Sequence, residues 1–226
     1  MSYGNLDERL GLAFDLYESC GLAADIGTDH AHLPAALLES GKCRRMILTD
    51  LSENALAHAR ETILARGLAD RAELRLGNGL EPLREKCAMI SVLGMGGRTI
   101  RDILLSGRER LHGAGLLLSA HTDLPEVRRA VMDIGYHLVS ETPCRAAGRF
   151  YLLLKAAPGA ETLSEEEVRL GRRLLESDSP LLPAYLARRR EIVAERLRGL
   201  READAPNEVL IRQAESDLRY YEAHGT

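Results

Sequence analysis

The chain has 226 residues, of which 45% are hydrophobic and 28% charged, and its formal net charge is −4. This length favours one main domain with room for a small appendage, since typical domains contain roughly 100 to 200 residues. No apolar run approaches the roughly 20 residues of a membrane span, and the amino terminus lacks the pattern of a targeting signal, so we expect a cytoplasmic protein without a membrane partner.

The cysteines and the basic residues carry little functional signal by themselves. The cysteines form no CxxC pair, which argues against a zinc site of the usual spacing and against a disulfide framework, so we expect packed thiols and no metal; they are Cys20, Cys43, Cys87 and Cys144. Arginine makes up 27 of the 30 basic residues, which suits phosphate binding but also follows from a GC-rich genome. A polyanionic partner would need a local basic patch instead of an overall excess.

The first predicted strand, Leu22–Ile26, follows a helix-like segment and runs directly into a glycine turn and the start of a helix. A Rossmann-like sheet holds a nucleoside cofactor at such a turn. Asp29 and Ala31 occupy positions where a dinucleotide site has glycines that admit a pyrophosphate, so we do not expect NAD or FAD. S-adenosylmethionine, an adenosyl ligand without phosphates, fits an acidic turn better.

The ends of the first two strands supply the first expected cofactor contacts. Asp25 can accept hydrogen bonds from backbone amides or from the methionine ammonium of the cofactor, and Gly27 lets the chain turn sharply. The second predicted strand, Met46–Asp50, ends on an acid about 20 residues further on, the spacing expected for a carboxylate that binds ribose hydroxyls. The alternative role for Asp50 is a helix N-cap, but Ser52 is already placed to cap the following helix.

The turn after the third predicted strand, Ala72–Leu76, has the sequence Gly77-Asn78-Gly79-Leu80. It places the Asn78 amide where the adenine edge of the cofactor would lie. The alternative is a plain tight turn, because Asn-Gly is a common turn pair.

The fourth predicted strand, Met89–Leu93, leads into Gly94-Met95-Gly96-Gly97. Most enzymes that methylate amino groups with S-adenosylmethionine have Asp or Asn, two prolines and an aromatic residue at this place. The glycines would leave exposed backbone and open space beside the donor methyl, which suits a flat base entering edge-on. The alternative is a phosphate-binding loop, which would need a lysine, and Arg98 is the only adjacent cation.

The fifth predicted strand, Leu116–Ser119, is followed by a helix that Asp123 can cap. Two more strands are predicted over Tyr136–Thr142 and Phe150–Lys155. The loop between them has no room for a helix and contains Pro143, Ala147 and Gly148. Because a parallel crossover needs a dozen or more residues, this pair must be antiparallel. We therefore expect an α/β fold with a mostly parallel, seven-stranded Rossmann-like sheet, whose terminal hairpin resembles that of class I methyltransferases.

Pro158 marks a change in composition, and we expect a first domain over 1–157 and a helical, coiled-coil-like hairpin over 158–226. Ser164 with Glu167 forms a capping box that predicts the start of a helix. Further starts are predicted at Pro180 to Pro183 and at Pro206-Asn207, and apolar stripes on these two helices predict an antiparallel pair.

The carboxy-terminal segment has two alternative roles. From Ala156 onward it contains 11 arginines and 14 acids, so it is no basic arm. The hairpin is either a structural or dimerising element, or it binds RNA phosphate through its Arg188-Arg189-Arg190 cluster. We expect a monomer or a weak homodimer.

Three motifs and the Arg-rich hairpin closely resemble the bacterial tRNA adenine-N1 methyltransferases that modify position 22; the motifs are Asp25-Ile26-Gly27-Thr28-Asp29-His30-Ala31, Leu76-Gly77-Asn78-Gly79-Leu80 and Gly94-Met95-Gly96-Gly97. The resemblance covers almost the whole chain. It implies a Rossmann-like methyltransferase domain, S-adenosylmethionine as the donor, tRNA as the substrate and a coiled hairpin that helps to hold the tRNA.

The expected site residues lie at the strand ends and on the hairpin. Those expected to bind the cofactor are Asp25, Gly27, Thr28, Asp29, Asp50, Leu51, Gly77, Asn78, Gly79, Gly94, Met95 and Gly96. Those expected to bind the substrate are His30, His32, Gly97, Arg98, His121, Arg188 and Arg189. The candidate catalytic residues are Asp29 and His32. Asp29 would accept a hydrogen bond from the exocyclic amine of the base or fix the sulfonium end of the cofactor. His32 or His121 would stack on the flipped base or hydrogen-bond to it. The alternative for His32 is a solvated ring on a helix face.

Two segments depart from the family pattern. His32 stands where the family usually has a tyrosine, and Ser119-Ala120-His121-Thr122 stands where it usually has Gln-Pro-Asn. Both should border the substrate pocket. Two other functions therefore stay open: a methyltransferase-like RNA-binding or scaffold protein without catalysis, and a methyltransferase for another RNA or a small molecule.

Overall fold

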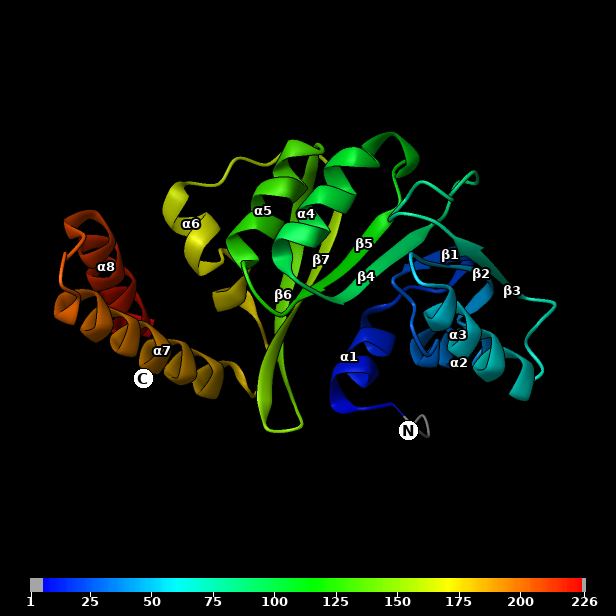
Figure 1. Cartoon of the computed structure of the whole chain (residues 1–226), viewed down its shortest axis with the longest axis horizontal. Helices are drawn as coiled ribbons and strands as arrows, with labels where there is room; N and C mark the ends of the chain where they lie inside the picture. Colours follow the sequence, from blue (N-terminus) through cyan, green and yellow to red (C-terminus); the bar gives the residue numbers. More distant parts are fainter. Residues whose placement is uncertain (1–5, 225–226) are drawn as a thin grey trace.

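The computed structural model describes residues 6–224. Their strands form one seven-stranded sheet in the order β3-β2-β1-β4-β5-β7-β6 (Figure 1). The strands are β1 (Cys20–Ile26), β2 (Cys43–Asp50), β3 (Ala72–Leu76), β4 (Met89–Met95), β5 (Gly115–Ala120), β6 (Tyr136–Ala146) and β7 (Arg149–Pro158). The first five are parallel, and β7 runs antiparallel to both β5 and β6. The predicted fold, a mostly parallel sheet with a terminal hairpin, is confirmed.

Helices cover both faces of this sheet and bury two apolar cores. The helices are α1 (Glu8–Leu16), α2 (His32–Glu39), α3 (Glu53–Ala65), α4 (Gly97–Ser106), α5 (Leu124–Asp133), α6 (Glu165–Leu170), α7 (Leu182–Glu202) and α8 (Glu208–His224), with short 3-10 turns η1 (Arg108–Arg110) and η2 (Arg173–Glu176). Successive strand residues point to opposite faces, so Ala24 and Ile26 pack with α4 and α5, and Ala23 packs with α1, α2 and α3.

Local hydrogen bonds explain where several helices begin. The Ser52 hydroxyl accepts from the Ala55 amide at 3.3 Å, and Ser164 with Glu167 forms a complete capping box, as predicted. The predicted Asp123 cap is wrong. Asp123 precedes α5 but has a left-handed backbone (φ 52°), whereas capping residues usually have an extended one, and its side chain makes no capping bond.

The β6–β7 hairpin is longer and tighter than predicted. Its turn consists of Ala147 and Gly148, which both have positive φ, as a two-residue hairpin turn requires. Pro143, predicted in the loop, lies within β6 and pairs with Leu152. A proline is accepted there because β6 is the edge strand of the sheet, where an outward-facing position needs no amide donor.

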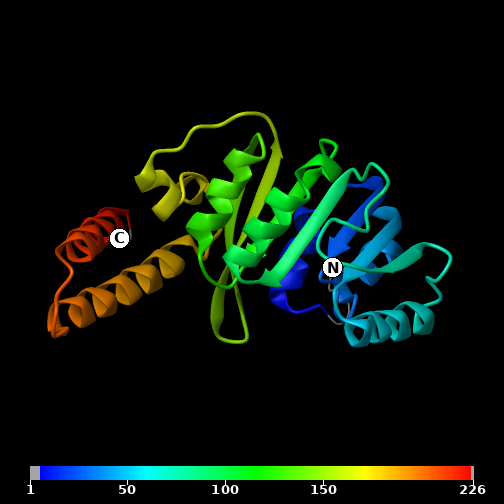
Figure 2. The ribbon, with the colours of Figure 1, turned by 45° about the horizontal axis from the view of Figure 1, so that its top comes forward.

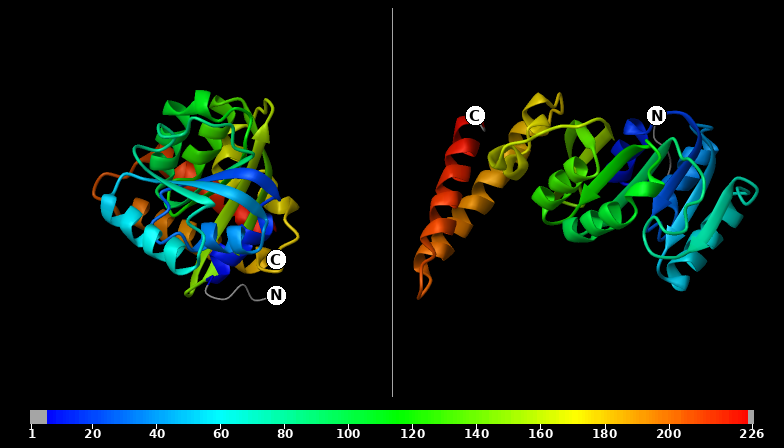
Figure 3. Two further views of the ribbon diagram at one scale, coloured as in Figure 1. Left: turned by 90° about the vertical axis from the view of Figure 1, so that its right-hand side faces the viewer. Right: turned by 90° about the horizontal axis from the view of Figure 1, so that it is seen from above.

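The carboxy-terminal helices extend from the β6 edge of the sheet. Figures 2 and 3 show α7 leading away from the sheet and α8 returning beside it, which confirms the predicted antiparallel pair. The buried faces of the two helices include Tyr185, Leu186, Val193 and Leu197 on α7 and Ile211, Ala214 and Tyr221 on α8. An ion pair at 2.8 Å between Arg169 and Asp217 connects α6 to α8.

A buried ion pair attaches the start of this region to the sheet. The Arg128 guanidinium on α5 donates to the Glu141 carboxylate on β6 at 2.7 Å, and neither side chain is more than 2% exposed. Arg128 also donates to the Val168 carbonyl of α6, and Glu141 accepts from the Arg173 amide of η2. The elements α6 and η2 therefore pack on the sheet, while the domain boundary expected near Pro158 stays a prediction.

Two further observations concern the whole described chain. No helix within residues 6–224 is long and apolar enough to cross a membrane. All four cysteines are free thiols, as expected, and the sulfur atoms of Cys20 and Cys43 lie 3.3 Å apart on the adjoining strands β1 and β2.

Candidate functional site

Three cavities follow one another along the carboxyl edge of the sheet. The first and second, named below for Asp50 and Asp25, meet at Gly27, which lines both. The second and third share His121. Gly27 directly follows β1, the strand flanked by β2 and β4, where the strand order reverses. This reversal is the position at which open α/β sheets bind ligands. A positive φ of 73° at Gly27 allows the chain to leave the strand sharply there.

The Asp50 cavity has a volume of about 370 Å³ and lies between the ends of β2, β3 and β4. Predicted cofactor residues line it, namely Gly27, Asp50, Leu51, Gly77, Asn78, Gly79 and Met95. Asp102 from α4 adds a second carboxylate. Within the described chain, no lysine or arginine lines this cavity. The cavity therefore suits a ligand with hydroxyl or amine donors and disfavours a phosphorylated one.

The Asp50 carboxylate is oriented by the backbone that follows it. Its Oδ1 accepts from the Ser52 amide at 2.8 Å, and Ser52 itself caps α3, so Asp50 is not the cap. Oδ2 of Asp50 has no partner among the described residues and can accept from a ligand. Leu51 lines the same cavity with 70% of its surface exposed, which offers an apolar face for a flat ring.

The Asp25 cavity has a volume of about 330 Å³ and combines one cation with three carboxylates. Arg9 from α1 is the cation, and Asp7, Asp25 and Asp29 are the acids. Asp25 is buried and accepts a hydrogen bond from the Ser91 hydroxyl. Burial raises the pKa of Asp25 from 3.8 to about 6, while the bond from Ser91 opposes that rise. A zwitterion could match these charges.

The turn after β1 brings Asp29, His30 and His32 into the lining of the Asp25 cavity, and their predicted roles stay predictions. Asp29 and Ala31 have left-handed backbones, with φ of 42° and 53°. His32 begins α2, and its ring stacks on that of His30 at 5.6 Å. Burial and the neighbouring His30 lower the pKa of His32, so its ring is neutral at pH 7.

The glycines at the end of β4 and the start of α4 have different surroundings. Gly94 is exposed with φ 76°, lines the Asp25 cavity, and a Cβ there would lie 3.7 Å from Nε2 of His121. The expectation of open space is wrong for Gly97, because a Cβ there would lie only 2.3 Å from the Asp123 carbonyl. The close approach of α4 to the loop before α5 requires this glycine.

The structure places three expected ligand residues, Gly96, Gly97 and Arg98, outside the described cavity linings. Gly96 is the residue before α4. Arg98 is 73% exposed and lies 3.9 Å from Asp123. Their predicted contacts with cofactor and substrate stay predictions.

The third cavity, here the arginine groove, has a volume of about 420 Å³ between the β6–β7 turn and α7. Four arginines line it, and no Asp or Glu does so in the described chain; the arginines are Arg145, Arg149, Arg188 and Arg189. Of the predicted cluster, Arg190 lies outside this lining. Phe150 and Tyr151 supply aromatic surface, with the Arg145 guanidinium 5.6 Å from the Phe150 ring.

Sequence reasoning missed several residues that the fold brings into these cavities or into contact with the residues that line them. Arg9 lies 5.6 Å from the Tyr151 ring, and His58 on α3 lies 3.9 Å from Asp29. Ser91 is on the middle of β4, beside Asp25. Each is a single polar residue within an ordinary helix or strand pattern, so no local signal marks it.

Comparisons with known proteins agree with this geometry. A family model described as a methyltransferase domain matches residues 6–154. A tRNA (adenine(22)-N(1))-methyltransferase of Bacillus subtilis (strain 168) is 27% identical over 172 residues, which cover 75% of this chain and 72% of the relative.

Solved structures extend the likeness to the carboxy-terminal helices. A proposed tRNA (m1A22) methyltransferase from Streptococcus pneumoniae superposes with a TM-score of 0.87 and 27% identity over 98% of this chain and 100% of that one. The same protein in complex with S-adenosyl-L-methionine gives a TM-score of 0.84 over 96% of this chain and 98% of that one, at 27% identity. The B. subtilis M1A22 tRNA methyltransferase shares the fold, with a TM-score of 0.86 at 21% identity over 98% of this chain and 99% of that one.

Proposed function

The chain belongs to the methyltransferase domain family, and from this membership we propose that it transfers a methyl group from S-adenosylmethionine to N1 of an adenine in tRNA. The names of the Bacillus and Streptococcus relatives support the choice of tRNA and of adenine N1. A cytoplasmic location belongs to the same proposal.

The observation that carries the proposal is the contrast between the two cavities that meet at Gly27. The Asp50 cavity has two acids and no described cation, which fits a nucleoside without phosphates. The Asp25 cavity has one arginine among three acids, which fits the carboxylate and ammonium of an amino acid. A ligand that joins an unphosphorylated nucleoside to an amino acid is S-adenosylmethionine.

The residues divide the binding of the cofactor between them. Asp50 would accept from the ribose hydroxyls, and Asn78 would bind the adenine edge beside Leu51. Arg9 would bind the carboxylate, while Asp25 or Asp29 would accept from the ammonium. When bound, the cofactor supplies an electrophilic methyl group on its sulfonium.

The target adenine needs positioning more than acid or base catalysis. Its N1 lone pair is free at neutral pH but faces outward only when the base leaves its stack, so the protein must extrude, orient and desolvate the base. Exposed Gly94 leaves room beside His121 for a flat ring. Asp29 would accept from the exocyclic amine, and the neutral ring of His32 would stack on the base or hydrogen-bond to it.

The arginine groove would hold the RNA backbone beside the extruded base. Its arginines can contact phosphates, and its aromatic rings can stack on a neighbouring nucleotide. His121 lines both the groove and the Asp25 cavity, so a strand in the groove would reach the catalytic cavity directly. Phosphate contacts of this kind predict binding that weakens steeply with salt.

Transfer of labelled methyl groups to bacterial tRNA tests the proposal. We expect incorporation by the parent protein and a loss of at least about tenfold in Asp29→Asn, which removes the charge but tolerates the left-handed backbone. Asp70→Ala, an exposed acid on another loop, is the matched control and should keep the parent rate. Parent-like activity with normal cofactor affinity in Asp29→Asn would remove Asp29 from the mechanism, and no incorporation with any tRNA would contradict the function.

A further inference from the structure

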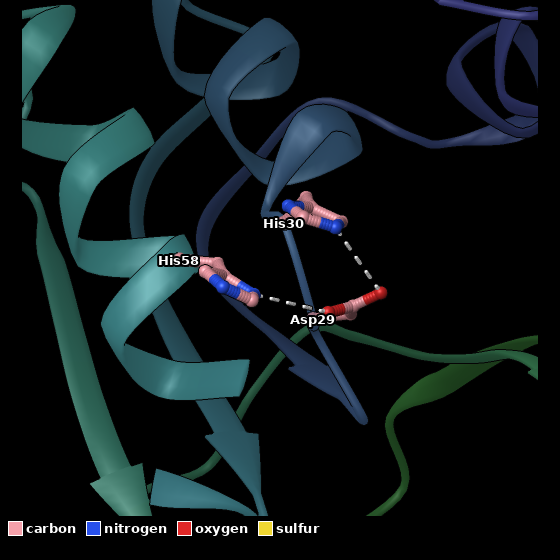
Figure 4. A group of neighbouring side chains, drawn as sticks. All are labelled: Asp29, His30 and His58. Atoms are coloured by element: carbon pink, nitrogen blue, oxygen red, sulfur yellow. Dashed lines mark ion pairs between the residues drawn. The ribbon is translucent and has the colours of Figure 1, made fainter. Parts of the chain in front are cut away.

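Asp29, His30 and His58 form a cluster of potential metal ligands beside the Asp25 cavity. Nε2 of His30 lies 3.7 Å from one Asp29 oxygen, and Nδ1 of His58 lies 3.9 Å from the other. One ligand atom from each residue can be chosen so that all lie within 4.8 Å of one another. Figure 4 shows both imidazole rings directed toward the Asp29 carboxylate.

The backbone beneath the cluster is firmly placed, and its side chains are free to adjust. The turn that carries Asp29 is anchored by bonds from the Gly27 and Thr28 amides to the Thr49 carbonyl and from the Ala31 amide to the Thr28 carbonyl. His58 is on α3, whose opposite face is buried. The three side chains are between 51% and 64% exposed, so they can rotate toward an ion without moving the backbone.

The donor set selects one class of ion. Two imidazole nitrogens and one carboxylate oxygen suit Zn²⁺, Co²⁺ or Ni²⁺, whereas Mg²⁺ and Ca²⁺ prefer oxygen ligands alone. Bonds of about 2.1 Å in a tetrahedral site place donors roughly 3.4 Å apart, a few tenths of an ångström closer than the contacts of Asp29 here. The rings of His30 and His58 now stack at 4.8 Å, so binding would turn them out of that stack.

We propose that Asp29, His30 and His58 bind a divalent transition-metal ion of this class and that the bound ion blocks methyl transfer. The second half rests on the proposed function. Asp29 and His30 line the Asp25 cavity, so an ion on them would withdraw the carboxylate that the cofactor or the target adenine needs. His58 is not among the described residues that line the three cavities, so its replacement separates metal binding from the chemistry.

Titration of the tag-free, metal-stripped protein with Co²⁺ tests the site without any activity assay. The parent should develop visible d–d absorption at one ion per chain, and His58→Ala should weaken binding at least about tenfold. The control His224→Ala changes an exposed histidine at the end of α8 and should bind like the parent. A Cys20→Ser background removes one thiol of the Cys20–Cys43 pair, whose coordination of the ion would show as ultraviolet charge transfer.

The outcomes separate the two halves of the proposal. No visible band in the parent, or equal affinity in a folded His58→Ala or His58→Asn protein, would overturn the metal site. Zn²⁺ should inhibit methyl transfer by the parent, a chelator should restore it, and His58→Ala should keep the basal rate and resist the ion. Co²⁺ binding without Zn²⁺ inhibition would overturn the blocking role alone, and a protein without methyltransferase activity would still answer the Co²⁺ test.

Discussion

The Asp50 cavity and the arginine groove lie along the same edge of the molecule and have opposite charge. Two acids and no described cation line the cavity, whereas four arginines and no described acid line the groove. The cavity is built from the ends of parallel strands, and the groove from a hairpin turn and α7. Under the proposed function, this separation would let one protein bind a cofactor through its hydroxyls and a polyanion through its phosphates, with the reacting groups meeting in the Asp25 cavity between them.

The largest expected effect comes from breaking the buried ion pair between α5 and β6, two elements that also contribute Leu124 and Arg145 to the groove. Arg128→Met leaves the Glu141 carboxylate buried and unpaired, which should lower the free energy of unfolding by about 3–5 kcal/mol. Urea denaturation measures the change. Arg128→Met with Glu141→Leu should recover much of the loss, because no buried charge then remains. Equal stability of the single variant and the parent would contradict the importance assigned to this pair.

The ionised Asp25 carboxylate should lower the free energy of unfolding of the protein without cofactor. Burial raises the pKa of Asp25 from 3.8 to about 6, so the stability present below pH 3.8 is lost as the pH rises through 6. Asn cannot ionise, so Asp25→Asn should be about 3 kcal/mol more stable than the parent at pH 7.5 and similar to it at pH 4. Thermal unfolding of both proteins at both pH values measures this difference. If the stability gain of Asp25→Asn over the parent were no larger at pH 7.5 than at pH 4, the prediction would be contradicted.

Loss of the Asp50 carboxylate should weaken the binding of the cofactor and leave tRNA binding unchanged. Removing hydrogen bonds to a charged group predicts a fall of about 10-fold to 100-fold in S-adenosylmethionine affinity for Asp50→Ala, with tRNA affinity unchanged. Calorimetry gives the first value and filter binding the second. Glu53→Ala, an exposed acid in the first turn of α3, is the control and should bind both ligands normally. A parallel loss of tRNA binding would show that the two regions are not separate.

Replacement of arginines in the groove should weaken tRNA binding and leave cofactor binding unchanged. This is the smallest of the expected effects. Arg188→Ala with Arg189→Ala should lower tRNA affinity about tenfold and reduce the slope of log affinity against log salt by about 2, with S-adenosylmethionine binding unchanged. Arg190→Ala removes an exposed neighbour outside the groove lining and should change tRNA affinity least. If Arg190→Ala cost as much as the pair, the groove would not be the binding surface.

The two regions also differ in how far the sequence predicts them. Asp25, Asp50 and Asn78 lie within two residues of the ends of strands, and the carboxyl ends of parallel strands meet at one edge, so their convergence follows from local patterns. Arg9 and Arg145 reach their cavities through the packing of α1 and the length of the β6–β7 hairpin, which no local pattern contains.

The wrong expectations have the same cause. The Asp123 cap and the open space at Gly97 both fail because the loop before α5 packs against the start of α4. The sequence predicts Pro143 in the loop between two strands, and its place in β6 depends on that strand being at the edge of the sheet. These outcomes depend on contacts between distant segments, which composition and spacing do not reveal.

Mass spectrometry of nucleosides from tRNA incubated with the protein and labelled S-adenosylmethionine tests the central claim most directly. The account predicts that the label appears in 1-methyladenosine and that fragment mapping places it in the D-loop region, as the resemblance to the position-22 enzymes implies. Label confined to another nucleoside, or absent from tRNA while the protein binds the donor, would contradict the account.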